Sequence, residues 1–147
     1  METSADSINL ISPHLDDLTH PIVGVGIDLV ENNRIRKILD RFGERFLNRI
    51  FTQHETDYCV QKPDPVQSLS ARFAVKEAVY KALNGEPGMN LAWKDCETVS
   101  NPSGIPEIIL HGSVRKRADE LGVGNILLSL THDINWSAAV VIALGKK

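Results

Sequence analysis

Segment 23–30 alternates apolar side chains with a second set of positions, a period of two that predicts a β-strand. One face of this strand carries Val23, Val25, Ile27 and Leu29, and the other carries Gly24, Gly26, Asp28 and Val30. Asp28 is the only charge in the strand and lies on its glycine-bearing face, which another backbone or a ligand can approach closely. A lone Asp near a strand end is also typical of a helix cap, so both roles stay open.

Segment 70–85 follows a helical period instead, with alanines at positions 71, 74, 78 and 82. Gly85 stands where a left-handed cap is expected to end the helix. Glu77 and Lys81 are four residues apart, so they share one face, and Phe73 lies one turn before Glu77. The pair is either an ordinary surface ion pair or part of a site, and a site needs a second carboxylate such as Asp28.

The remaining segments predict one α+β domain with a mixed or antiparallel sheet around this long central helix. Segment 32–50 has a helical period with a break at Gly43, and Thr52 with Glu55 forms a capping-box pattern. A hairpin is expected around turn 101–104, a helix over 113–121, and two paired strands over 126–131 and 138–144.

Charge and composition narrow the class of protein. The 147 residues suit a single domain, and Lys plus Arg total 16 against 19 for Asp plus Glu, which argues against a nucleic-acid partner. No apolar run approaches the roughly 20 residues of a membrane span. Cys59 and Cys96 lack metal-ligand spacing and are expected to be reduced, buried thiols. Residues 1–21 contain no Lys or Arg, so we interpret them as an N-terminal extension of unknown role and not as a targeting segment.

Basic residues nevertheless recur every three or four positions along segment 32–50, at Arg34, Lys37, Arg41, Arg45 and Arg49. Such a stripe is often only a solvated helix face. In an acidic protein it also favours an acidic partner through electrostatic steering.

Three blocks of the sequence together resemble a known family. They are Gly24-Val-Gly-Ile-Asp-Leu-Val-Glu31, then Arg72-Phe-Ala-Val-Lys-Glu-Ala78 with Lys81-Ala-Leu83, and then Leu128-Ser-Leu-Thr-His132. In order and spacing they are similar to the holo-(acyl-carrier-protein) synthases, the short type of 4'-phosphopantetheinyl transferase. The likeness runs from about Val23 to Leu144, and we expect residues 22–147 to form the transferase domain.

The resemblance implies transfer of 4'-phosphopantetheine from coenzyme A (CoA) to a serine of apo-acyl carrier protein, with release of 3',5'-ADP. It implies a cytoplasmic, homotrimeric, Mg²⁺-dependent enzyme that supports fatty acid biosynthesis. Asp28 and Glu77 would hold the metal, since Mg²⁺ takes one or two carboxylates besides substrate phosphates and waters. Lys81 and His132 would bind CoA phosphates and act in catalysis with Glu77. The acceptor of the serine proton is Glu77 or a metal-bound water.

The resemblance also assigns the basic stripe to carrier docking, through Arg34, Arg45 and Arg49. Asn84 and Gly85 would contact CoA, although Asn84-Gly-Glu-Pro-Gly88 differs from the Gly-Thr-Gly usual there. His132 alone, without the family, is typical of a hydrogen-bonded structural residue.

Two other functions use the same residues. A metal-dependent hydrolase of CoA or nucleotides would need the carboxylates but no docking face. A non-catalytic protein that binds the carrier would need the basic stripe alone, without Asp28, Glu77, Lys81 and His132.

Overall fold

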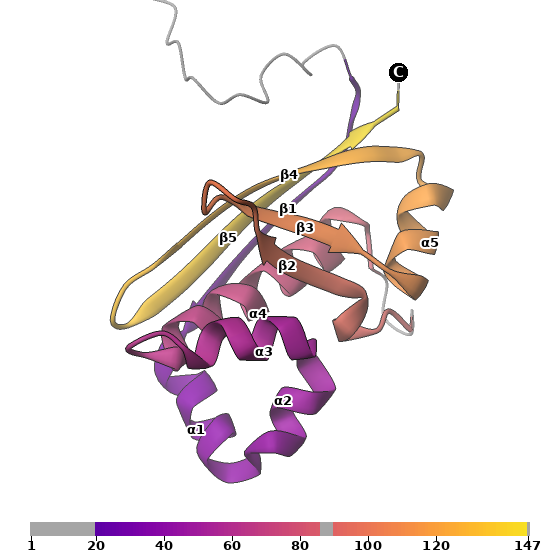
Figure 1. Cartoon of the computed structure of the whole chain (residues 1–147). Helices are drawn as coiled ribbons and strands as arrows, with labels where there is room; N and C mark the ends of the chain where they lie inside the picture. The colour runs from indigo at the N-terminus through magenta and orange to yellow at the C-terminus, as the bar shows by residue number, and fades with distance from the viewer. Residues whose placement is uncertain (1–19, 86–89, 147) are drawn as a thin grey trace, which may run out of the picture.

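The computed structural model describes residues 20–85 and 90–146, and its main sheet joins the two ends of this part of the chain (Figure 1). Strand β1 (Ile22–Glu31) pairs with β5 (Trp136–Gly145), which pairs with β4 (Val123–His132), all antiparallel. The predicted pairing of segments 126–131 and 138–144 is confirmed. The register sets Asp28, Ala139 and Leu130 side by side across the three strands.

Helix α4 (Pro65–Ala82) is the long central helix and crosses the inner face of this sheet (Figure 1). It begins five residues before the predicted start, because the Asp64 side chain accepts a hydrogen bond from the Val66 N–H at 3.1 Å. Pro65 takes the first helical position, where its missing N–H costs nothing.

The predicted cap at Gly85 is wrong, since Asn84 is the residue with the left-handed φ of 52°. The Asn84 N–H bonds to the Lys81 carbonyl at 3.1 Å and the Gly85 N–H to the Tyr80 carbonyl at 2.9 Å. These two bonds close a Schellman motif in which Asn84 takes the position usually held by glycine.

The smaller elements match their predicted positions. Helices α1 (Asn32–Phe42) and α2 (Glu44–Ile50) meet at Gly43, which has a φ of 52°. Helix α3 (Gln53–Val60) begins with the predicted capping box. Strands β2 (Cys96–Ser100) and β3 (Pro106–Leu110) form the hairpin, preceded by the short helix η2 (Trp93–Asp95) and followed by helix α5 (Gly112–Glu120).

The two faces of the main sheet differ sharply in burial. Alanines of α4 pack on the inner face, where Ala139, Val141 and Ala143 of β5 are buried. No helix among residues 20–85 and 90–146 covers the outer face, and Val25, Ile27 and Leu29 of β1 are exposed by 58, 63 and 62 %. The glycine-bearing side of β1 is therefore the side that packs.

Some predictions fall outside the described residues. Most of the N-terminal extension and the turn at Glu86–Gly88 lie there, and the division of the chain at residue 21 stays a prediction. Cys59 and Cys96 are buried and free, as expected. Over residues 20–85 and 90–146, no helix has the length and apolar character needed to cross a membrane.

Candidate active site

Two glycines let α4 lie directly on the backbone of β1. A Cβ atom added to Gly26 would lie 1.7 Å from the Ala78 carbonyl oxygen, and one added to Gly24 would lie 1.8 Å from that of Ala82. This close approach brings Asp28, the next residue on the same face of β1, to the side of α4 that carries Lys81.

Asp28 and Lys81 form an ion pair. Lys81 Nζ donates to Asp28 Oδ1 at 3.0 Å and to the Ile27 carbonyl at 2.9 Å, and half of the Lys81 side chain stays exposed. The expected partner of Lys81 was Glu77, one turn earlier. Asp28 does not cap a helix, because the residue at the start of α1 is Glu31.

Glu77 lies within the electrostatic field of the same pair. Burial raises the pKa of Glu77, and the negative charge of Asp28 raises it further, while Lys81 and Arg34 lower it. The structure thus brings together two carboxylates and two cations from β1, α1 and α4. Of the four residues predicted at the metal and phosphate site, it places Asp28, Glu77 and Lys81 in one group.

The donor set fits a hard cation such as Mg²⁺. Asp28 and Glu77 offer carboxylate oxygens, and their mutual repulsion is the kind of strain that a bound cation relieves. In the part of the chain that the structure describes, no cluster of three or more His, Cys, Asp or Glu side chains could hold a metal. Two carboxylates are nevertheless enough for Mg²⁺ when a substrate phosphate supplies further oxygens.

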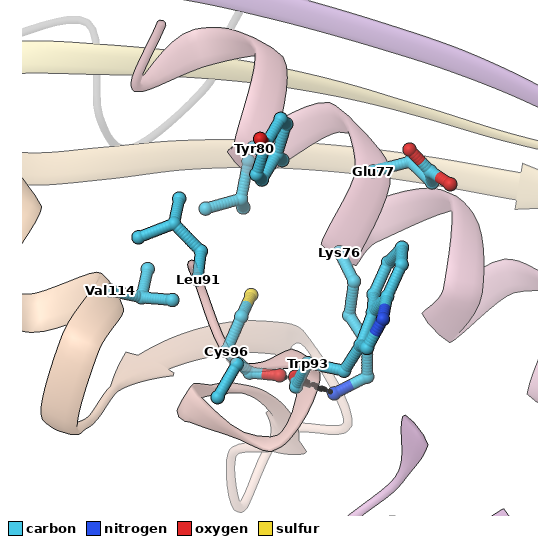
Figure 2. A pocket seen from close by; sticks show the side chains of 9 residues that line it. Lys76, Glu77, Tyr80, Leu91, Trp93, Cys96 and Val114 are labelled. Atoms are coloured by element: carbon cyan, nitrogen blue, oxygen red, sulfur yellow. Dashed lines mark hydrogen bonds between the residues drawn. The ribbon is translucent and has the colours of Figure 1, made fainter. Parts of the chain in front are cut away.

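A hollow of about 300 Å³ adjoins Glu77 (Figure 2). Its walls are mostly apolar and come from α4, η2, β2, α5 and the residues before η2, including Tyr80, Leu91, Trp93 and Val114. The Trp93 ring stacks on Phe73, with ring centroids 5.4 Å apart. This hollow gives an extended, partly apolar substrate a place beside Glu77.

Sequence reasoning missed Lys76, the residue before Glu77. Its side chain is buried and points away from Glu77 (Figure 2), where Nζ bonds to Glu55 Oε1 at 2.8 Å and to the Trp93 carbonyl at 3.0 Å. Glu55 in turn accepts the Thr98 N–H at 3.1 Å. The Lys76–Glu55 pair links α3, α4, η2 and β2. The sequence did contain one indication of a buried charge here, a lysine within the apolar pattern of the central helix.

His132 lies elsewhere, at the end of β4. Its Nδ1 is 3.1 Å from the Gln67 side-chain oxygen, and Gln67 precedes Glu77 by ten residues, about 15 Å along α4. Strand β5 also separates β4 from β1. One chain therefore does not bring its own His132 to Asp28 and Glu77.

The surroundings of His132 are themselves suited to anions. His132 lines a hollow of about 400 Å³ together with Lys62 and Arg72, and the Arg72 guanidinium stacks 4.2 Å from the centre of the Tyr58 ring. Arg72 is buried, and its Nε has no hydrogen-bond partner within the described chain. A buried, unsatisfied N–H of a cation that borders a hollow is a donor for an incoming anion.

The three arginines predicted to dock a carrier are exposed and divide between two helices. Arg34 is the third residue of α1 and is near enough to lower the pKa of Glu77, whereas Arg45 and Arg49 lie on α2, where they border a groove of about 410 Å³. Apolar residues line the rest of this groove, among them Phe42, Phe46, Phe73 and Trp93. Asn84 and Gly85 follow the end of α4, about one turn beyond Lys81, and their contact with CoA stays a prediction.

Comparison with known proteins decides the family. Residues 24–141 match the model of the 4'-phosphopantetheinyl transferase superfamily. The chain belongs to that superfamily. A holo-[acyl-carrier-protein] synthase of Leptospira biflexa is 42 % identical to this transferase chain over 121 residues, 82 % of this chain and 95 % of the relative. One from Chlamydia trachomatis is 44 % identical over 120 residues, 82 and 98 % of the two chains.

Solved structures give the same family and fold. The holo-[acyl-carrier-protein] synthase of Neisseria meningitidis superposes on this transferase chain with a TM-score of 0.76 and 31 % identity, over 86 % of this chain and all of that one. The Helicobacter pylori synthase, solved in complex with CoA, gives 0.71 and 32 %, over 81 and 98 %. The resemblance seen in the sequence and the predicted α+β fold are thereby confirmed.

Proposed function

We propose that this protein transfers 4'-phosphopantetheine from CoA to a serine of apo-acyl carrier protein and releases 3',5'-ADP. The observation that carries this proposal is the group of Asp28, Glu77 and Lys81 beside the basic start of α1. The CoA complex of the Helicobacter pylori relative supports the donor substrate. We propose further that the reaction depends on Mg²⁺ and supports fatty acid biosynthesis in the cytoplasm.

The chemistry follows from the charges of the site. The pyrophosphate of CoA repels a nucleophile, so a transferase must neutralise its oxygens and align the attacking hydroxyl with the leaving group. Mg²⁺ held by Asp28 and Glu77 would supply positive charge there. Lys81 stabilises the charge that develops on the leaving phosphate, and its exposed ammonium is free to reach a substrate while Asp28 holds its other side.

Glu77 is the group that we assign to the serine proton. Without a metal, burial and the neighbouring Asp28 raise the pKa of its carboxyl, the direction that favours uptake of a proton. The serine arrives on the carrier, which we propose docks on Arg34, Arg45 and Arg49 and on the apolar groove that Arg45 and Arg49 border. An acidic partner with apolar side chains fits this combination.

The second half of the site would come from another copy of the chain. The outer sheet face exposes Val25, Ile27 and Leu29, and a contiguous apolar face of this kind marks an interface. We propose a homotrimer, the state that the family resemblance implies, in which the His132 hollow of one chain faces Asp28 and Glu77 of its neighbour. His132, Lys62 and Arg72 would then bind the phosphate groups at the nucleotide end of CoA.

Intact-mass measurement tests the transfer directly. Apo-acyl carrier protein incubated with the protein, CoA and Mg²⁺ is expected to gain one phosphopantetheine, roughly 340 Da, and to gain nothing when a chelator is present. Cleavage of CoA without a mass gain would instead indicate a hydrolase. Binding of the carrier with neither outcome would indicate a non-catalytic partner.

A further inference from the structure

Gln67 and His132 face each other across the fold although 65 positions separate them in the chain. The Gln67 side-chain oxygen lies 3.1 Å from His132 Nδ1, so the imidazole donates its Nδ1–H to this oxygen. Of the two ring nitrogens, Nε2 is then the one available to a ligand in the hollow. The bond therefore decides which atom of His132 a substrate meets.

Both partners are held by their own elements. Gln67 stands in the first turn of α4, which Asp64 caps and which the Arg36–Asp64 ion pair at 3.2 Å fixes to α1. The turn after His132 is closed by Asp133, whose Oδ1 accepts the backbone N–H groups of residues 135 and 136 at 2.8 and 2.6 Å. The contact is thus formed between two anchored ends.

Because the Gln67 amide is neutral, the protonation state of His132 depends on the other groups around the hollow. These are the cations Lys62 and Arg72, the phenol of Tyr58, and the carboxylates Asp64 and Asp133. A carboxylate in place of the amide would favour the charged ring. An imidazole that donates through Nδ1 can donate through Nε2 as well only when it carries both protons.

We propose that Gln67 is a positioning residue for His132, which directs Nε2 toward the phosphate groups of CoA, so that His132 can donate a hydrogen bond to them only as an imidazolium. This inference rests on the proposed function, in which the His132 hollow binds CoA. It adds a specific consequence: affinity for CoA falls as the pH rises and the ring loses its second proton.

The test compares Gln67→Glu, Gln67→Leu and the wild-type protein by NMR titration of the His132 ring nitrogens in the absence of substrate. Gln67→Glu is expected to move the midpoint upward by about one pH unit, and Gln67→Leu to lower it. Asn48→Asp, which adds the same negative charge on the exposed side of α2, serves as the matched control and should leave the midpoint in place.

The enzymatic readout is the pH dependence of the KM for CoA. In Gln67→Glu, the KM for CoA should begin to rise at a higher pH, by the same amount as the His132 titration midpoint moves. This change in the KM profile should disappear in the double variant that also carries His132→Ala. The inference is overturned if the His132 titration midpoint is unchanged in Gln67→Glu, or if it moves while the pH dependence of the KM for CoA does not. It is also overturned if the nitrogen chemical shifts of the wild-type ring show a proton on Nε2 alone. Failure of the proposed function would be seen separately, as absence of phosphopantetheine transfer by the wild-type protein.

Discussion

The contact between β1 and α4 makes the replacement of Gly26 by alanine a sharp test of how the site is built. The added Cβ would lie 1.7 Å from the Ala78 carbonyl oxygen, whereas ordinary contact begins at 3.4 Å. The backbone of α4 would have to move away by about the difference, 3.4 − 1.7 = 1.7 Å. Overpacking of a tight core costs about 1–3 kcal/mol. Because the atom that clashes is a backbone oxygen, which cannot rotate away as a side chain can, we expect Gly26→Ala to cost an amount near the upper limit of this range.

We therefore expect Gly26→Ala to lower the free energy of unfolding by about 3 kcal/mol, measured by urea denaturation. The same displacement moves Asp28 away from Glu77 and Lys81, so the transfer rate should fall by more than the unfolded fraction explains. Gly122→Ala is the control, because its φ of 73° adds strain while no atom lies within 4 Å of the new Cβ.

The size of the two effects decides between packing and backbone conformation. Gly122→Ala should cost about 1–2 kcal/mol and leave the transfer rate of the folded protein unchanged. A loss below about 1 kcal/mol in Gly26→Ala, or a loss equal to that of the control, would show that α4 does not rest on the β1 backbone.

Three further predictions concern Asp28, Arg34 and the two buried thiols. Asp28→Ala should abolish Mg²⁺-dependent transfer in the intact-mass assay yet change the free energy of unfolding by less than about 1 kcal/mol, since its partner Lys81 is half exposed; retained transfer would remove Asp28 from the site. Arg34→Glu should raise the KM for the carrier about tenfold with little effect on the KM for CoA, while the same reversal at exposed Arg115 on α5 changes neither; equal effects on both substrates would contradict docking at α1. Burial raises the pKa of Cys59 to about 11 and that of Cys96 to about 12. The native state then keeps protons that unfolded thiols lose above about pH 9, so the free energy of unfolding should fall as the pH rises from about 9 to 11, and alkylation at pH 8 should require denaturant. Rapid alkylation of the native protein would refute this.

Local signals in the sequence were sufficient for most of the fold. The alternation over segment 23–30, the alanine spacing on the central helix and the Thr52–Glu55 capping box each correspond to an element of the structure. The exceptions are at helix ends, where neighbouring residues compete for the left-handed position that closes the helix. Asn84 takes the left-handed position because its N–H and that of Gly85 then donate to the carbonyls of Lys81 and Tyr80. The preference of glycine for this position does not predict that outcome.

The candidate site divides in the same way. Residue types and spacing selected Asp28, Glu77 and Lys81, since chemistry of this kind needs carboxylates beside a cation. Lys76 and Gln67 were not selected, because a buried ion pair and a bond across 65 positions leave no local pattern.

The sequence by itself determined the strands, the helices and the family and predicted the carboxylates of the site, because strands and helices rest on spacing within short segments and the family on three such segments in order. Only the tertiary structure decided that the glycine face of β1 is the buried one, that Lys81 pairs with Asp28, and that His132 lies away from Glu77 in its own chain. The physical reason is that these facts depend on the distance at which two elements pack. Two glycines set that distance for β1 and α4, and the order of the strands sets it for His132.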